Sequence, residues 1–171
     1  SDLPYVEITS EIDIENEPKV PGQLRIYEGD EEVFTSTIGI EYRGSTSFRL
    51  SDKKSYGFET WDDNNNDEAK SILGFPEEED WILMGHVFRA SEGIIFDPTL
   101  IRHHIGYELY RSMGNYASRS QFVELAVNGD FMGTYLLMEK LKRDNDRIDI
   151  ARLEENDTDP EQITGGYILK I

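Results

Sequence analysis

Two apolar segments on either side of Asn128-Gly129 constrain the fold more than any other part of this sequence. Asparagine and glycine both tolerate the positive φ of a two-residue type I′ turn, so residues 122–142 predict a β-hairpin. Such a turn sets three opposite pairs: Val127 with Asp130, Leu125 with Met132, and Val123 with Thr134. It also sets the residues on one face: Val123, Leu125, Val127, Met132, Leu136 and Met138. Both faces are largely apolar, which indicates a central hairpin rather than a solvated edge.

Gly133 lies inside the second strand of this hairpin. Glycine weakens the interior of a strand, so its presence indicates a bulge, tight packing or the close approach of a ligand to the backbone. The strand ends in a charged stretch that contains Glu139, Lys140 and Lys142. This charged exit is the first place to look for chemistry.

The rest of the pattern predicts an α+β fold, mainly an antiparallel sheet with one principal helix. Alternating or apolar segments predict strands at residues 5–8, 23–27, 33–42 and 55–61, and residues 81–84 are expected to be buried. The helix is predicted over Asp97–Gly114, because Asp97-Pro98 is a capping start and glycine ends helices. Its apolar stripe contains Ile101, Ile105, Leu109 and Met113.

Three further elements are predicted from shorter signals. A short helix is expected at residues 69–74, a weak strand at 147–153 and an apolar strand at 164–171. The segment 85–96 gives no pattern from which a shape can be predicted.

The charge balance restricts the class of partner. Seventeen basic residues against 35 acidic residues give a net charge of −18. Such a field repels nucleic acid and anionic membranes, so neither is an expected partner. No apolar stretch approaches the roughly 18 residues that span a bilayer. The chain has no cysteine, which excludes disulfides and thiolate chemistry.

The basic residues are concentrated in two windows, since eight of the seventeen fall within 43–54 and 140–147. Together, these windows would form a positive pocket suited to a phosphate-bearing ligand; ordinary surface charge with local ion pairs is the alternative. A glycine beside small hydroxyl residues can offer backbone N–H groups and side-chain hydroxyls as donors to phosphate oxygens. The turn with this composition consists of Arg43, Gly44, Ser45, Thr46 and Ser47. Lys53 or Lys54 would supply the additional charge.

No metal site is predicted in this chain. Residues 62–68 lack the glycine and the closing glutamate of a calcium loop. His103 and His104 are adjacent and therefore point to different faces of a helix, and His86 is isolated in the sequence.

Six segments in order resemble the CotH kinase family, the spore coat protein H-like atypical protein kinases. They are RGSTSF at 43–48, KKSYGFE at 53–59, LGFPEEEDWIL at 73–83, DPTLIRHHIGYELYRSMG at 97–114, the hairpin at 122–142, and TGGYILKI at 164–171. The resemblance covers most of residues 38–171, whereas residues 1–37 form an N-terminal β region without an assigned role. It implies the small lobe of a kinase-like fold that transfers the γ-phosphoryl of ATP, with Mg²⁺, to protein hydroxyls.

The resemblance also implies which residues bind the nucleotide. Arg43, Gly44, Ser45, Thr46 and Ser47 match the phosphate-covering turn, and Lys54 is the candidate nucleotide-contacting lysine. Arg102 matches the arginine of the family's helix motif, in the place of the kinase αC helix. Glu139, Lys140 and Lys142 would lie at the hinge side of the adenine pocket.

The sequence departs from the family pattern at Phe48, at His103 and in the segment 85–96. No H-R-D or D-F-G-like element occurs, so we expect only the small lobe and hinge, with no catalytic residue and no turnover. The alternative is a non-catalytic surface, adhesion or coat-structural module on the same scaffold. The protein substrate is not indicated, and an exported or cell-surface bacterial protein is the expected setting.

Overall fold

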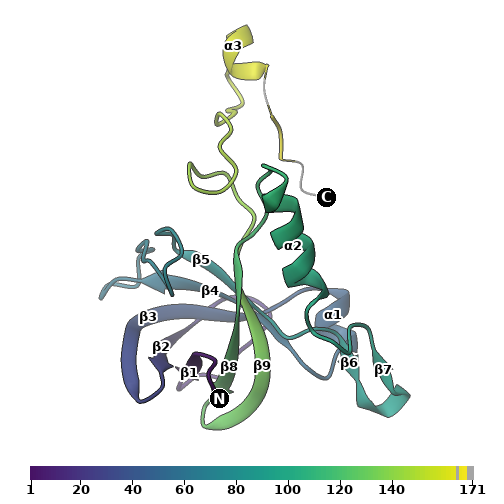
Figure 1. Cartoon of the computed structure of the whole chain (residues 1–171). Coiled ribbons are helices and arrows are strands. Elements are labelled where there is room, and N and C mark those ends of the chain that lie inside the picture. Colours follow the sequence, from purple (N-terminus) through teal and green to yellow (C-terminus); the bar gives the residue numbers. More distant parts are fainter. Residues whose placement is uncertain (165, 169–171) are drawn as a thin grey trace.

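Seven strands form a closed barrel in the order β1-β2-β3-β4-β5-β9-β8 (Figure 1). The computed structural model describes residues 1–164 and 166–168. Strand β8 pairs in parallel with β1 and thereby closes the barrel, whereas the other neighbours pair antiparallel. The prediction of a mainly antiparallel sheet with few helices is confirmed. Closure was not predicted; it removes the exposed strand edges that an open sheet would present.

The strands of the barrel are β1 (Tyr5–Thr9), β2 (Val20–Glu28), β3 (Glu31–Arg43), β4 (Ser55–Trp61), β5 (Asp80–Met84), β8 (Ser120–Val127) and β9 (Asp130–Glu139). A separate two-stranded sheet contains β6 (Phe88–Arg89) and β7 (Ile94–Ile95), joined by the 3-10 turn η1 (Ala90–Glu92). The helices are α1 (Thr46–Leu50), α2 (Arg102–Ser112) and α3 (Pro160–Ile163). After β9, the chain leaves the barrel and extends away from it through α3 (Figure 1). No helix among the described residues combines the length and apolar character needed to cross a membrane.

The strands predicted before the hairpin are all present, and β4 has the predicted bounds. Residues 1–37 contribute β1, β2 and part of β3 to the barrel. The predicted helix at 69–74 is wrong, because Lys70 instead forms an isolated bridge with Glu78. The predicted strand at 147–153 is also wrong, since Ile148 makes only an isolated bridge with Arg143. Of the predicted strand at 164–171, residues 165 and 169–171 lie outside the described residues, and 166–168 form no strand.

The hairpin turn is confirmed, but the strand register beyond it differs from the prediction. Asn128 and Gly129 have φ values of 51° and 85°, and Val127 pairs with Asp130. The register then shifts, so that Leu125 pairs with Gly133 and Val123 with Tyr135. The predicted pairs of Leu125 with Met132 and Val123 with Thr134 are therefore wrong. The cause is a bulge that leaves Met132 without a partner in the ladder; it is followed by Gly133, whose φ of 84° lies in the region that favours glycine.

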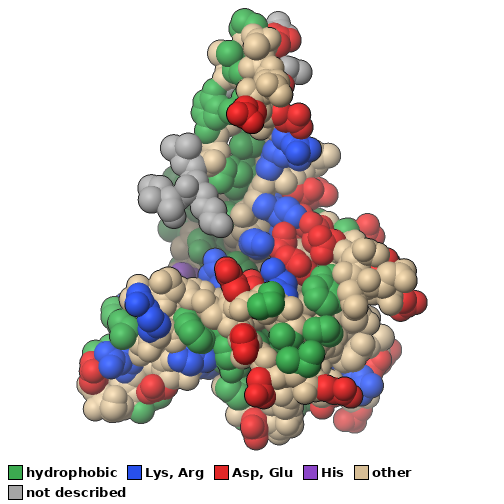
Figure 2. Space-filling view, turned by 180° about the vertical axis from the view of Figure 1, so that it is seen from behind, with side chains coloured by type: hydrophobic (Ala, Val, Ile, Leu, Met, Phe, Trp, Pro, Cys, Tyr) green, Lys and Arg blue, Asp and Glu red, His purple; other side chains and the backbone are tan. Residues whose placement is uncertain are grey.

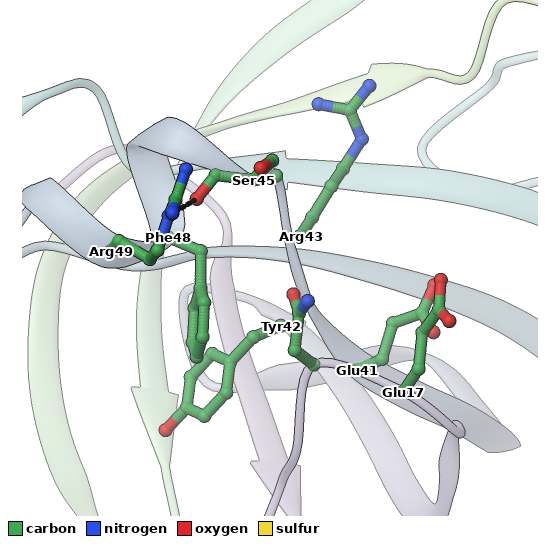
Figure 3. A pocket seen from close by; sticks show the side chains of 9 residues that line it. Glu17, Glu41, Tyr42, Arg43, Ser45, Phe48 and Arg49 are labelled. Atoms are coloured by element: carbon green, nitrogen blue, oxygen red, sulfur yellow. Dashed lines mark hydrogen bonds between the residues drawn. The ribbon is translucent and has the colours of Figure 1, made fainter.

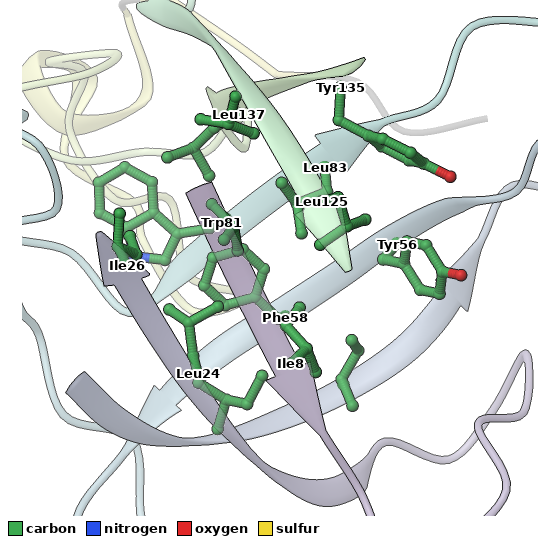
Figure 4. Close-up of a cluster of buried hydrophobic side chains, with 14 of the residues drawn as sticks. Ile8, Leu24, Ile26, Tyr56, Phe58, Trp81, Leu83, Leu125, Tyr135 and Leu137 are labelled. Atoms are coloured by element: carbon green, nitrogen blue, oxygen red, sulfur yellow. The ribbon is translucent and has the colours of Figure 1, made fainter. Parts of the chain in front are cut away.

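The shift exchanges the two faces of β9 from Thr134 onward, whereas Met132 packs against the main core as predicted. Tyr135 and Leu137 join Val123 and Leu125 in the main core, whereas Leu136 and Met138, predicted on that face, lie in a second cluster outside the barrel. This follows because a one-residue slip moves every side chain of a strand to the opposite face. The barrel interior contains several large, fully buried side chains, shown in Figure 4: Trp81, Tyr56, Phe58, Tyr135, Leu24, Ile26, Leu83 and Leu125.

Helix α2 begins five residues later than predicted. Asp97 still supplies the capping carboxylate, because its oxygens accept from the backbone N–H of Thr99 at 3.1 Å and of Arg102 at 2.9 Å. The predicted apolar stripe is exposed rather than buried at all four positions: Ile101, Ile105, Leu109 and Met113. The helix instead packs through Tyr107 against the second cluster, and His104 Nδ1 lies 2.9 Å from Ser120 Oγ. Phe122, on the outer face of the barrel beside Ser120, contacts the His104 ring.

We predict that Gly133→Ala destabilises the protein by about 1–2 kcal/mol, the usual cost of a side chain in the left-handed region. A Cβ at Gly133 would meet only Lys53 Nζ at 3.8 Å, so the cost comes from backbone conformation rather than from a clash. Chemical denaturation measures the effect. The control is Gly106→Ala in α2, where a Cβ meets nothing within 4 Å and a gain of up to about 1 kcal/mol is expected. An equal loss in both variants would contradict the role of the bulge.

Candidate functional site

A cavity of about 550 Å³ opens beside the turn that joins β3 to α1 (Figure 3). The residues that line it are Asn16, Glu17, Glu41, Tyr42, Arg43, Gly44, Ser45, Phe48 and Arg49. Three of the predicted nucleotide-binding residues therefore lie together, and Thr46 and Ser47 begin the adjoining helix. Figure 3 shows the Arg43 side chain extending away from Arg49, whose Nε donates to the Ser45 carbonyl at 3.4 Å. The two guanidinium groups thus do not converge on one point.

The turn itself depends on Gly44. Its φ of 99° favours glycine, and a Cβ at this position would lie 2.3 Å from the Ser47 hydroxyl oxygen. Ser45 occupies the N-cap position of α1 without making a side-chain capping bond. The turn can therefore present a hydroxyl and the Arg43 guanidinium to a ligand in the cavity.

Lys54, the predicted nucleotide-contacting lysine, is bound to protein oxygens. Its ammonium group donates to the carbonyls of Phe48 at 2.6 Å and Ser51 at 2.8 Å, at the C-terminal end of α1. A cation at this end satisfies carbonyl groups that have no partner within the helix. Lys54 therefore stabilises the helix that forms one wall of the cavity.

Lys53 points in a different direction. Its Nζ donates to the Thr134 carbonyl at 2.5 Å, lies 4.5 Å from the centre of the Tyr135 ring, and lines a second cavity of about 280 Å³. Burial lowers the pKa of Lys53. The sequence left open which of the two lysines faces the pocket, and neither lies in the lining of the cavity beside Arg43.

Arg102 lies at the first position of α2, with its side chain largely exposed. Its Nε is 3.5 Å from Asp97 Oδ1, and the residue lines a third cavity together with Tyr107, Tyr110 and Tyr116. Arg102 is thus not in the lining of the cavity formed by the turn at Arg43.

The charged exit of β9 forms part of an ion-pair network, which we call the exit network. It contains four carboxylates (Glu78, Glu79, Asp80 and Glu139) and four cations (Arg119, Lys140, Lys142 and Arg147). Acidic and basic side chains are intermixed where the C-terminal segment meets the barrel (Figure 2). The network connects β9 and the chain that follows it to the start of β5.

Glu139 is the buried centre of the exit network, with no exposed surface. Its carboxylate accepts from the Arg119 guanidinium at 2.6 Å and from the Arg119 backbone N–H at 2.8 Å, and Arg147 Nε lies 3.9 Å away. The Tyr116 hydroxyl donates to it at 3.3 Å. Burial and the nearby Glu139 charge raise the pKa of Tyr116 to about 12.

Arg147 is nearly fully buried and holds the following segment against the barrel. It donates to the carbonyls of Asp80 at 2.9 Å and Lys140 at 2.8 Å, and its guanidinium carbon lies 5.2 Å from the centre of the Trp81 ring. A buried charge without a partner is costly, so these contacts fix the path of the chain after Glu139.

Lys142 binds three carboxylates at once. Its ammonium group lies 2.9 Å from Glu78, 2.6 Å from Glu79 and 2.9 Å from Asp80. Burial lowers the pKa of Lys142, but these hydrogen bonds outweigh burial and leave the pKa raised. Burial raises the pKa of Asp80, yet hydrogen bonds from Lys140 and Lys142 leave it lowered.

The predicted site residues therefore fall in three separate places: the turn at 43–47 with Lys54 behind it, Arg102 on α2, and the exit network. Sequence reasoning did not identify the other members of the network: Arg119 just before β8, Arg147 in the segment after β9, and Glu78, Glu79 and Asp80 at the start of β5. The acidic residues just before Trp81 and the basic residues just after Glu139 have complementary charges, and this pattern in the sequence could have predicted their pairing.

Comparison with known proteins adds a family-level finding. The model of a family described as CotH kinase protein matches residues 40–171. No curated protein matches the sequence. The match includes the turn at Arg43, helix α2 and the exit network.

We predict that Lys142→Met destabilises the protein by about 1–3 kcal/mol at neutral pH, because three crowded carboxylates lose their common cation. The lowered pKa of Asp80 stabilises the fold above its unfolded pKa of about 3.9 and stops doing so as the pH falls through its folded value. The difference between variant and wild type should therefore shrink below about pH 4.

Urea denaturation at a series of pH values measures this difference. The control is Lys140→Met, which removes a single ion pair with Asp80 that is more exposed than those of Lys142. This change should lower the free energy of unfolding by less than about 1 kcal/mol. A deficit in Lys142→Met that stays constant down to pH 2 would contradict the electrostatic origin.

Proposed function

This chain belongs to the CotH kinase family, and from that membership we propose that it is the nucleotide-binding half of a kinase that transfers the γ-phosphoryl of ATP to protein hydroxyls. The family match over residues 40–171 is the observation that carries the proposal. In this proposal the barrel and α2 act as the small lobe, and the chain after Glu139 acts as the hinge.

The cavity beside Arg43 is our candidate site for the phosphate chain. Guanidinium groups form charge-assisted hydrogen bonds with phosphate oxygens, and the Ser45 hydroxyl adds a neutral donor. Its volume of about 550 Å³ lies within the range of about 300–1,000 Å³ found for small-molecule sites. Lys54 supports this site indirectly, because it holds the end of α1, and Phe48 of that helix lines the cavity.

The cavity suits phosphate better than Mg²⁺. Magnesium binds through carboxylates and water, but Glu41, one of the two carboxylates here, already pairs with Lys19 at 3.3 Å. The described lining therefore does not present two free carboxylates. We propose no role for the residues of this cavity as metal ligands.

We propose that residues 1–171 bind nucleotide without consuming it. Phosphoryl transfer depends on positioning and on stabilising the charge of metal-bound phosphates, and this sequence has no H-R-D or D-F-G-like element for that purpose. Arg102 and the exit network are assigned a supporting role, in which they hold α2 and the hinge in place.

We predict that Arg43→Ala weakens Mg-ATP binding by about ten-fold or more, the effect of one lost charge-assisted hydrogen bond. Isothermal titration calorimetry of wild type and variant measures the dissociation constants. The control is Arg25→Ala on β2, whose side chain is exposed, pairs with Glu7 and Glu32, and lies outside the cavity. Equal weakening in both variants would contradict the proposed site, and robust ATP hydrolysis by this chain would contradict the expected lack of turnover.

A non-catalytic surface, adhesion or coat-structural module on the same scaffold is the second candidate. The observation in its favour is that the ammonium groups of Lys54, Lys140 and Lys142 are all bound by protein oxygens. The same titration distinguishes the two candidates, because saturable Mg-ATP binding supports the kinase and its absence supports the module.

A further inference from the structure

His86, Asp97 and His103 come together between the segment that carries β6 and β7 and the start of α2. One possible ligand atom from each residue lies within 4.8 Å of the other two. The centres of the two imidazole rings are 5.9 Å apart, with an angle of 67° between the ring planes. His86 and Asp97 are buried and His103 is exposed, so the group is open on one side.

His86 lacks the partners that a buried polar group normally has. The residue is 7% exposed, and neither of its ring nitrogens makes a hydrogen bond of normal geometry, although the Leu100 backbone interacts weakly with the ring. Buried side-chain nitrogens are satisfied in the large majority of cases, so a buried imidazole without a hydrogen bond of normal geometry is a candidate ligand-binding group. The imidazole is also among the most common metal-binding groups in proteins.

Asp97 is held in a fixed orientation beside His86. Its Oδ1 accepts from the Thr99 hydroxyl at 2.6 Å and from the Thr99 backbone N–H, and its Oδ2 accepts from the Arg102 backbone N–H at 2.9 Å. A carboxylate has about four acceptor positions, so Oδ2 retains one that these bonds do not use. Hydrogen bonds of this kind orient carboxylates that bind metals.

We propose that His86, Asp97 and His103 form a binding site for a divalent transition-metal ion of the Zn²⁺ type. Two imidazole nitrogens and one carboxylate oxygen suit Zn²⁺ and its neighbours better than Mg²⁺ or Ca²⁺, which prefer oxygen ligands. Three protein ligands leave a further coordination position for water or another small ligand. The proposal is independent of nucleotide binding and of the Mg²⁺ that accompanies ATP.

The geometry requires a small closure around the ion. Metal–ligand distances of about 2.0–2.2 Å bring tetrahedral ligand atoms to within roughly 3.5 Å of one another. His103 can supply this movement because it is exposed on the first turn of α2. Two cations lie nearby, since Lys53 lines the cavity of His86 and Arg102 pairs with Asp97, and both weaken the attraction for a metal.

A second acidic group, Glu78, Glu79 and Asp80, has similar spacing. There, the Lys142 ammonium group already contacts all three carboxylates and occupies the position of a cation. Among the described residues, no lysine or arginine hydrogen-bonds to the His86 imidazole nitrogens. The histidine-containing group is therefore the one that we propose as a metal site.

The test is titration of the full chain with Zn²⁺ by calorimetry, and with Co²⁺ followed by its visible absorption. We expect one ion per chain, an increase in Tm with Zn²⁺, and no competition from excess Mg²⁺. His86→Gln and His103→Asn should each weaken Zn²⁺ binding by about 10–100-fold or more. Loss of a residue that only hydrogen-bonds to a metal ligand already has an effect of this size, and loss of a ligand itself should have at least the same effect. The control is His104→Asn, which removes the neighbouring histidine, whose Nδ1 contacts Ser120, and should leave binding unchanged.

Absence of saturable binding would overturn the proposal, as would unchanged binding in His103→Asn. Equal weakening in His103→Asn and His104→Asn would also overturn it, because that result indicates non-specific binding to surface histidines. If His86→Gln does not fold, the exposed His103 still decides the outcome. The Zn²⁺ titration contains no Mg-ATP. Failure of the metal proposal and failure of the nucleotide proposal are therefore detected in separate experiments.

Discussion

Strand β9 is the element on which the rest of the structure depends, because it pairs with β5 on one side and with β8 on the other. Together with the parallel pairing of β8 and β1, this closes the barrel around Trp81 and Tyr135. The bulge at Gly133 sets which side chains of β9 enter the core. The same strand delivers the Thr134 carbonyl to Lys53 and the Glu139 carboxylate to Arg119, so the core and the charged surroundings share one backbone.

The exit network explains why the two basic windows do not form one positive pocket. Lys140, Lys142 and Arg147 are bound by the three carboxylates at the start of β5, and the pair of Arg119 with Glu139 completes the network. Most of these side chains are largely removed from water, so each charge needs a partner. An unpaired buried charge destabilises the fold by more than a surface ion pair stabilises it. Of the first window, Arg43 and Arg49 line the cavity beside the turn, which is the candidate site for phosphate, whereas Lys53 and Lys54 are bound by backbone carbonyls elsewhere.

Two different sites are thus proposed on one scaffold. The turn at Arg43 could be recognised from its sequence, because glycine adopts positive φ and a turn of this kind exposes backbone N–H groups that can bind anions. The group of His86, Asp97 and His103 could not, because its members are up to 17 positions apart and His86 belongs to a segment without a pattern. The sequence correctly indicated that His103 and His104 point to different faces, but not that His103 would face His86.

The sequence by itself determined the strands before the hairpin, the Asn128-Gly129 turn, the capping role of Asp97 and the family. These depend on local properties: alternation of side chains, the φ preferences of single residues and short motifs. Only the tertiary structure decided the closure of the barrel, the register beyond Ala126, the face of α2 that packs, and the partners of Lys53 and Lys54. Each of these depends on contacts between distant segments, and a single bulge beside Gly133 was enough to decide which side chains of β9 enter the main core and which join the second cluster.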